Sequence, residues 1–217
     1  MFKSKLSFVL ALVMLFSAAG YAEAERYYHD IREIVTDCEV SLHYLREGNR
    51  RFLAGESLPR DAYAEAREIL GEGQHPFAVI LTCADSRVAP EIYFDQRLGD
   101  IFVIRNAGNI ADTSALGSIE FAVGHLRAPL VVVVGHSACG AVAGALLDGV
   151  EFTDNLQSVI NKIHPAVDSH EELADATIAN IRHGVALIQA NPVVIESGAS
   201  VMGAIYNIVT GEVTFLE

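Results

Sequence analysis

The chain has 217 residues, of which half are apolar and a fifth are charged, as in an ordinary globular protein. Its formal net charge of −13 at pH 7 makes it a poor candidate for binding nucleic acid or an anionic membrane surface. No stretch reads as disordered or low in complexity, and no repeat occurs at the period of a solenoid.

Residues 1–24 carry the pattern of a secretory signal peptide. Lys3 and Lys5 precede the apolar run LSFVLALVMLFSAA, and the small-residue motif AEA follows that run. A membrane anchor is the alternative, but the run is short for a membrane span and no basic stop-transfer segment follows. We therefore expect cleavage after Ala24 or Ala22 and a periplasmic or secreted protein with no stable membrane anchor.

Residues 25–217 are predicted to form a single domain, since no linker-like composition interrupts them. Residues 25–54 read as a helical arm with a broken apolar stripe that includes Leu42 and Leu45, and residues 60–70 as a second helix.

The middle of the chain alternates between strand-like and helix-like segments. Three short, continuous apolar runs are typical of parallel strands buried on both faces: residues 76–82, 100–104 and 128–136. Helix-like segments follow them in turn: residues 89–96, 114–126 and 139–149. A mostly helical stretch runs on to Asn191, and residues 203–217 read as a hairpin that turns at Thr210-Gly211. This order predicts an α/β fold with a mostly parallel central sheet flanked by helices.

Chemically active residues gather where the three predicted strands end, in the segments TCADSR, IRNAGN and GHSACG. Open α/β sheets place their sites at the carboxyl ends of the strands. Cys83, His136 and Cys139 are donors that suit Zn²⁺ in tetrahedral geometry, and the His-x-x-Cys spacing lets one turn present two of them. Three protein ligands leave a fourth position open, as in catalytic zinc sites.

Asp85 lies two residues after Cys83, so the two side chains can face the same side of an extended segment. Asp85 is therefore a candidate fourth ligand, unless Arg87 holds its carboxylate in a bidentate pair and leaves the position to water. Two thiolates cancel the charge of Zn²⁺, so we expect activity that rises at alkaline pH.

Each of these residues also has a simpler interpretation. Cys83 and Cys139 could pack as buried thiols or form a disulfide, and His136 could be a hydrogen-bonded core histidine. Cys38, on the arm, is predicted to pack, with an intermolecular disulfide as the alternative. The cluster of all these residues at strand ends favours the metal site.

The segments CADSRVAPE and GHSACGAV resemble the paired Cys-x-Asp-x-Arg and His-x-x-Cys motifs of the β-class carbonic anhydrases. GDIFVIRNAGN, LREGNRRF, LGSIEFAV and GAIYNIVTG are also similar to segments of that family, and the resemblance spans roughly residues 42–217. It implies the reversible hydration of carbon dioxide to bicarbonate and a proton by zinc-bound hydroxide, with one Zn²⁺ per chain.

The resemblance also implies residue roles. Zinc would bind Cys83, His136 and Cys139, with Asp85 as a conditional fourth ligand and Asp85 and Arg87 as the catalytic pair. Gln96 and the Gly140 N–H would bind substrate, and His125 is a candidate proton shuttle or, alternatively, a surface residue.

The family further implies a homodimer or homotetramer in which the N-terminal arm lies across the partner, although the arm could instead pack on its own domain. An alternative enzyme of the same fold would hydrolyse carbonyl sulfide or carbon disulfide. Alternatives of other classes are a redox protein that uses Cys83 and Cys139 as a dithiol and a zinc-stabilised binding module without catalysis.

Overall fold

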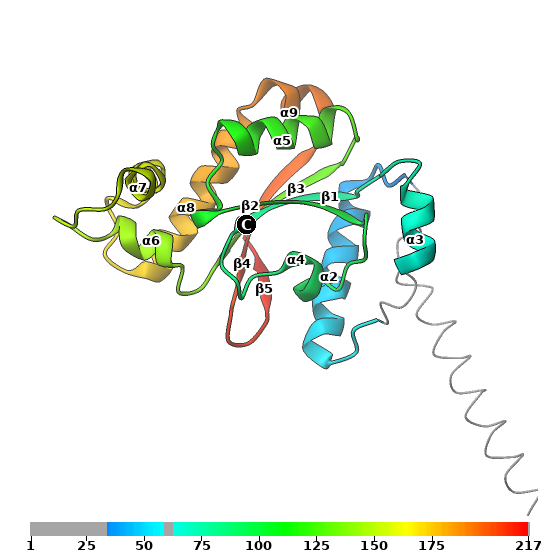
Figure 1. Cartoon of the computed structure of the whole chain (residues 1–217), viewed down its shortest axis with the longest axis horizontal. Helices are drawn as coiled ribbons and strands as arrows, with labels where there is room; N and C mark the ends of the chain where they lie inside the picture. The colour runs from blue at the N-terminus through cyan, green and yellow to red at the C-terminus, as the bar shows by residue number, and fades with distance from the viewer. Residues whose placement is uncertain (1–33, 59–62, 217) are drawn as a thin grey trace, which may run out of the picture. The chain divides into compact units, whose positions relative to one another are not determined.

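A five-stranded sheet organises the part of the chain that the computed structural model describes, residues 34–58 and 63–216 (Figure 1). The strand order is β2-β1-β3-β4-β5. The first four of these strands run parallel, and β5 runs antiparallel to β4. The strands are β1 (Ala78–Cys83), β2 (Ile101–Asn106), β3 (Leu130–His136), β4 (Ser200–Tyr206) and β5 (Val213–Phe215). The predicted α/β class and mostly parallel sheet are confirmed.

The two central strands owe their continuous apolar sequences to burial on both faces. Every residue of β1 (AVILTC) and of β3 (LVVVVGH) is buried. Strand β2, which pairs only with β1 among the described strands, is mostly half-buried. The predicted strands 76–82, 100–104 and 128–136 thus correspond to β1, β2 and β3 with shifts of one or two residues.

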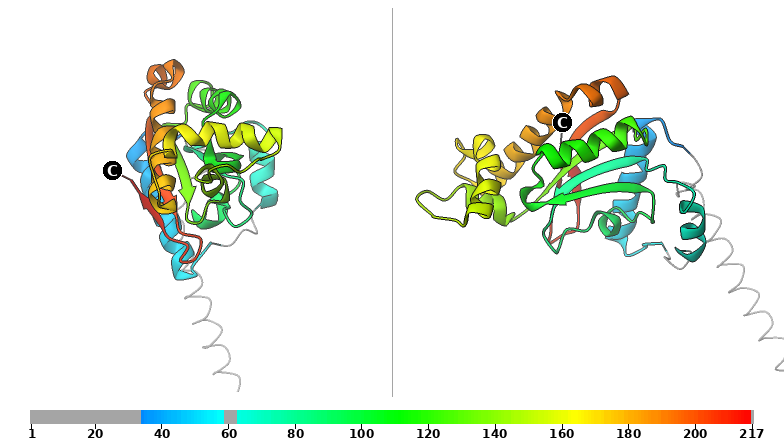
Figure 2. Two further views of the ribbon diagram at one scale, coloured as in Figure 1. Left: turned by 90° about the vertical axis from the view of Figure 1, so that its left-hand side faces the viewer. Right: turned by 45° about the horizontal axis from the view of Figure 1, so that its top comes forward.

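Helices cover both faces of this sheet (Figures 1 and 2). One face packs against α2 (Cys38–Ala54) and α4 (Pro90–Tyr93), and the other packs against α5 (Thr113–Gly124), α8 (Leu173–Gln189) and α9 (Pro192–Ser197). A third apolar cluster, which includes Cys83 and Cys139, joins α6 (Gly140–Ala145) and α7 (Asp154–Val167) to the carboxyl ends of the strands. The remaining elements are α3 (Tyr63–Leu70) and the short 3₁₀ helix η2 (Ala107–Asn109).

The predicted helices are longer than the observed ones. The segment 89–96 contains only the four-residue α4, and 139–149 contains only α6. The prediction for 114–126 is close, since α5 spans 113–124. The helical stretch predicted up to Asn191 contains α7 and α8. A further helix, α9, begins just after it at Pro192. Local patterns predicted where helices occur, whereas capping groups and packing decide where they end.

The N-terminal arm begins its helix later than predicted. Residues 34–37 are not helical, because the Asp37 side chain accepts a hydrogen bond from the Glu39 N–H and caps α2 at its start. Helix α2 packs on its own domain, with Leu45 fully buried in the core cluster that contains Phe77. Gly48 permits this close approach, since a Cβ there would lie 1.6 Å from the Phe94 carbonyl oxygen. The predicted signal peptide (1–24) and residues 25–33 of the predicted arm lie outside the described residues.

The C-terminal segment is more than the predicted hairpin. Strand β4 begins at Ser200, before the predicted start at Gly203, and pairs in parallel with the whole of β3. The connection to β5 spans residues 207–212, where Gly211 has φ 81°, so the turn is longer than the predicted Thr210-Gly211. A hairpin pattern predicts which strand pairs with one edge of β4, namely β5. It does not predict that β3 pairs with the opposite edge.

Among the helices of the described ranges, none combines the length and apolar character that a membrane crossing requires.

Candidate metal centre

The carboxyl ends of β1 and β3 bring Cys83, His136 and Cys139 together. The two strands are parallel neighbours, so Cys83 and His136, their last residues, emerge at the same edge of the sheet. One ligand atom from each of the three side chains lies within 4.8 Å of the others, and all three residues are buried. This is the group of three donors that the strand-end motifs predicted.

The turn between His136 and Cys139 returns the second sulfur to the histidine. Ala138 has φ 55°, in the left-handed region, which reverses the chain within a few residues. The Ser137 N–H donates to the Tyr206 carbonyl at 2.9 Å and ties the turn to β4. Cys139 is the N-cap residue of α6, one residue before the helix itself begins.

Hydrogen bonding orients the imidazole of His136 toward the sulfur atoms. Its Nδ1 lies 3.0 Å from the carbonyl oxygen of Ser137, which can only accept, so the proton lies on Nδ1. Its Nε2 is buried and has no hydrogen-bond partner among the described residues. A buried nitrogen lone pair aimed at two thiols is what a metal ion would satisfy.

The Cys83 sulfur is prepared to carry negative charge. The pKa of Cys83 is lowered, first by a hydrogen bond from the Cys139 thiol and then by His136 and the Gly108 N–H, although burial opposes the shift. The Gly108 N–H lies 3.4 Å from Cys83 Sγ. Gly108 adopts φ 74°, and a Cβ there would lie 2.5 Å from Ile163, so glycine is required at this contact. The Cys139 thiol donates the hydrogen bond to Cys83, so this bond, together with burial, raises the pKa of Cys139.

Asp85 lies beside the three donors but is directed onto Arg87. The carboxylate accepts from Arg87 Nε at 2.9 Å, from Arg87 Nη2 at 2.7 Å and from the Arg87 backbone N–H at 2.9 Å. The pKa of Asp85 is lowered strongly, chiefly by the guanidinium of Arg87. Its Oδ2 is 4.0 Å from His136 Nε2, which is beyond hydrogen-bonding distance. The bidentate pair predicted from the spacing is therefore present, and the carboxylate is bonded to Arg87 while it lies close to His136.

The structure gives Gln96 surroundings that the sequence did not suggest. Its amide nitrogen donates to the carbonyl oxygens of Phe94 at 2.6 Å and Tyr44 at 3.2 Å, and the residue is buried. The bond to Tyr44 joins α2 to the segment after α4, and the substrate role of Gln96 stays a prediction. Gly140 is exposed at the first position of α6, and a Cβ there would meet no atom within 4 Å. Its role as a substrate donor stays a prediction.

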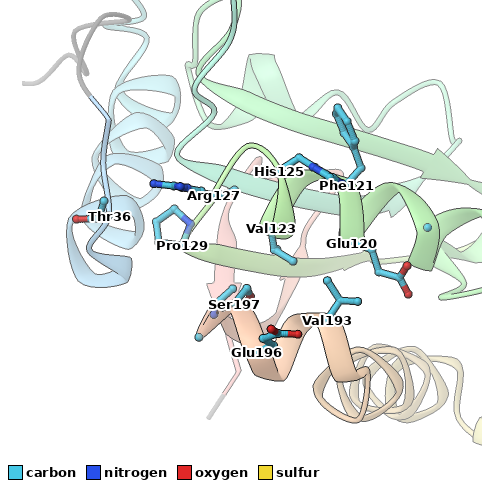
Figure 3. A pocket seen from close by; sticks show the side chains of 15 residues that line it. Thr36, Glu120, Phe121, Val123, His125, Arg127, Pro129, Val193, Glu196 and Ser197 are labelled. Carbon is cyan, nitrogen blue, oxygen red and sulfur yellow. Dashed lines mark hydrogen bonds between the residues drawn. The ribbon is translucent and has the colours of Figure 1, made fainter.

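His125 lies far from the three donors. It follows α5, which runs back to the edge of the sheet where β3 begins, whereas the donors lie where β3 ends. The seven residues of β3 separate these edges by about 20 Å. His125 instead lines a separate cavity of about 770 Å³ with Phe121, Glu120 and Glu196 (Figure 3). In the part of the chain that the structure describes, His125 and the donors lie at opposite edges of the sheet, and the proton-shuttle role stays a prediction.

The sequence analysis did not single out three residues that hold the site: Arg105, Gly108 and Ser137. Arg105 donates to the carbonyl oxygens of Cys83 and Asp85. The segment IRNAGN was identified as one of three strand ends rich in chemically active residues. Arg105 and Gly108 lie in it, so this segment was the sequence signal for both. Ser137 acts chiefly through its backbone, which a side-chain pattern does not reveal.

Comparison with known proteins decides the family. The family model described as "Carbonic anhydrase" matches residues 78–213, which include all three donors. Carbonic anhydrase 2 of Mycobacterium tuberculosis is 49% identical over 126 residues, which cover 57% of this chain and 61% of that protein. The carbonic anhydrase of Mycolicibacterium smegmatis is 37% identical over 78% of this chain and 88% of its own length.

Solved structures agree with these matches. The β-carbonic anhydrase CafA of Aspergillus fumigatus superposes with a TM-score of 0.66 at 30% identity, over 79% of this chain and 88% of that one. This chain belongs to the β-class carbonic anhydrase family. A Coccomyxa β-carbonic anhydrase in complex with acetazolamide superposes with a TM-score of 0.65 at 26% identity, over 78% of this chain and 83% of that one. The resemblance noted from the two motifs is therefore confirmed at the level of the family. The chain nevertheless spans only 61% of the length of the M. tuberculosis relative.

Proposed function

We propose that this β-class carbonic anhydrase catalyses the reversible hydration of carbon dioxide to bicarbonate and a proton. The observation that carries the proposal is the group Cys83, His136 and Cys139, whose ligand atoms lie within 4.8 Å of one another beside an Asp85 carboxylate held by Arg87. The Mycolicibacterium smegmatis relative, which matches 78% of this chain, is itself a carbonic anhydrase and supports the proposal.

The donors fit one Zn²⁺ per chain. Two sulfurs and an imidazole nitrogen are the donor types that zinc prefers, and the orphaned Nε2 of His136 supports a metal in preference to a packed core. All three cysteines of the chain are free, so Cys83 and Cys139 are available as thiolates. When bound, the zinc ion would supply Lewis-acid chemistry that makes a water molecule a nucleophile near neutral or alkaline pH.

The residues of the chain have separate tasks in this reaction. The carbonyl oxygen of Ser137 holds the Nδ1 proton and so keeps Nε2 of His136 available as a ligand. Asp85, already ionised, accepts a hydrogen bond from the attacking water and orients it toward carbon dioxide. Arg87 keeps this carboxylate on the guanidinium and out of the fourth ligand position.

A gas-hydration assay tests the function directly. We expect the zinc-loaded full chain to hydrate carbon dioxide in a stopped-flow indicator assay, and Cys139→Ser to lose both zinc and activity. Carbonyl sulfide and carbon disulfide, assayed in parallel, test the alternative substrates. A fully zinc-loaded protein with negligible carbon dioxide hydration contradicts the proposal, as does full activity in Cys139→Ser.

Location and assembly complete the proposal. The pattern of residues 1–24 supports export to the periplasm or secretion after cleavage, which N-terminal sequencing of the protein recovered from cells would test. We propose a homodimer or homotetramer, since a chain from the two β-carbonic anhydrases of Sordaria macrospora that are described as tetrameric superposes at 27% identity with a TM-score of 0.64, over 81% of this chain and 96% of that one. Light scattering of the purified protein would distinguish these states from a monomer.

A further inference from the structure

The backbone that carries the Asp85 carboxylate is fastened by a side chain of the neighbouring strand. Arg105, on β2, donates from Nη2 to the Asp85 carbonyl at 2.8 Å and from Nε to the Cys83 carbonyl at 3.2 Å. Between these two points the Ala84 N–H donates to the Asn106 carbonyl at 2.9 Å. The chain just past β1 is thus held from β2 at three successive residues.

The same carbonyl oxygen also anchors the turn that carries Arg87. The Asp85 carbonyl accepts a second hydrogen bond, from the Val88 N–H at 3.0 Å, while the Asp85 side chain accepts from the Arg87 N–H. Both acceptor sites of this carbonyl are then occupied. The position of the Asp85–Arg87 pair therefore depends on how the Asp85 peptide is held.

Arg105 is suited to this task. Its guanidinium donates to the two backbone carbonyls, so it acts on the carboxylate through the main chain. A guanidinium presents two donors in a rigid fork, whereas a lysine would offer one mobile ammonium. If the peptide were released, the carboxylate would need to move only slightly, since Asp85 Oδ2 is already 4.0 Å from His136 Nε2.

We propose that Arg105 is a positioning residue of this enzyme. By holding the Cys83 and Asp85 carbonyls, it keeps the Asp85 carboxylate on Arg87 and leaves the fourth metal position open to external ligands. This inference rests on the proposed metal centre, and it adds a residue outside the Asp-Arg pair that determines whether the site is open.

The test measures ligand access as well as turnover. The cobalt(II)-substituted full chain is titrated with azide and followed by visible absorption, in the wild type, Arg105→Gln and Arg105→Lys. Arg182→Gln, at an exposed position on α8, is the matched control. We expect the azide dissociation constant to rise about 10-fold or more in Arg105→Gln, with a smaller rise in Arg105→Lys, because Asp85 would compete for the metal. Carbon dioxide turnover should fall by a similar factor.

A double substitution separates positioning from general damage. In an Asp85→Asn background no carboxylate competes for the metal, so Arg105→Gln should leave the azide dissociation constant unchanged. The proposal is overturned if Arg105→Gln binds azide as the wild type does, or if its effect persists in the Asp85→Asn background. If the glutamine variant holds no cobalt, Arg105→Lys decides by the same measurement. A wild type that binds azide but hydrates no carbon dioxide would overturn the proposed function, while the azide comparison still tests Arg105.

Discussion

Two arginine–aspartate pairs in this protein have the same shortest contact and opposite surroundings. Arg51 Nε lies 2.7 Å from Asp95 Oδ2, and the side chains are 6% and 2% exposed. Arg87 Nη2 lies 2.7 Å from Asp85 Oδ2, but here the side chains are 54% and 18% exposed. The distances alone would class the two pairs together, whereas burial gives them different consequences.

The buried pair stabilises the packing of three segments. Asp95 adopts φ 48° and also accepts from the Leu58 N–H, so the pair joins α2, the segment after it and the segment after α4. The exposed pair can break at little cost to folding, because water replaces its hydrogen bonds. Beside the proposed metal centre, that freedom would allow the pair to act as a switch.

The largest expected effect is on folding, from Arg51→Ala. Removing one partner of a buried pair leaves an uncompensated charge, so we expect the free energy of unfolding to fall by about 3–5 kcal/mol. Urea denaturation followed by circular dichroism measures this change. Arg50→Ala, one residue away and paired with Glu47 on the surface of α2, is the control and should cost about 0.5 kcal/mol or less. Equal losses in the two variants would remove the distinction drawn from burial.

The second prediction concerns catalysis, through Arg87→Ala. Without its guanidinium partner the Asp85 carboxylate is free to occupy the open ligand position, so we expect turnover to fall about 100-fold or more while zinc content is unchanged. The thermal midpoint should stay close to that of the wild type, because this arginine is exposed. A variant that unfolds early, or one that keeps full activity, would show that the two pairs do not divide stability and function in this way.

The smallest effect is expected at a third pair, in which both side chains are partly exposed. Lys162 Nζ lies 2.7 Å from Asp112 Oδ2, with side chains 45% and 24% exposed. The pKa of Asp112 is lowered, chiefly by Lys162 and then by the Ala115 N–H of the α5 N-terminus. A carboxyl whose pKa is lower in the folded state stabilises the fold above its unfolded pKa of about 4 and loses that contribution as the pH falls below it.

Asp112→Asn tests this third pair, since asparagine keeps the helix cap and removes the charge. We expect a loss of about 0.2–1 kcal/mol at pH 7 that shrinks as the pH falls below about 4 and the Asp112 carboxyl of the wild type becomes protonated. Thermal unfolding of the variant and the wild type across this range measures the difference. A deficit that persists undiminished in acid would mean that the loss does not come from the ion pair.

Much of the site was predictable because its signals are local. The runs AVILTC and LVVVVGH predict buried parallel strands, and parallel neighbours end at one edge. The motifs that follow these runs then predict that Cys83, His136 and Cys139 meet. The bidentate Asp85–Arg87 pair was also predictable, since it spans two residues.

The roles that stay predictions depend on relations between distant segments. The family resemblance implies a substrate role for Gln96, and the structure adds a bond from its amide to the Tyr44 carbonyl, which lies 52 residues away in the chain. His125 was considered as a shuttle, although α5 carries it to the opposite edge of the sheet. In both cases the partner lies on an element whose packing the local pattern does not reveal.

The sequence by itself determined which residues can hold a metal, which segments are buried strands, and to which family the motifs point. The tertiary structure alone decided that β4 lies in parallel beside β3, that α2 packs on its own sheet, and that Arg105 reaches across from β2 to hold the peptide of Asp85. The physical reason is the distance along the chain over which each signal acts. The alternation of buried residues, the residues that form turns and the spacing of metal ligands are set within a few residues. Strand order and cross-strand hydrogen bonds depend on how the whole core packs.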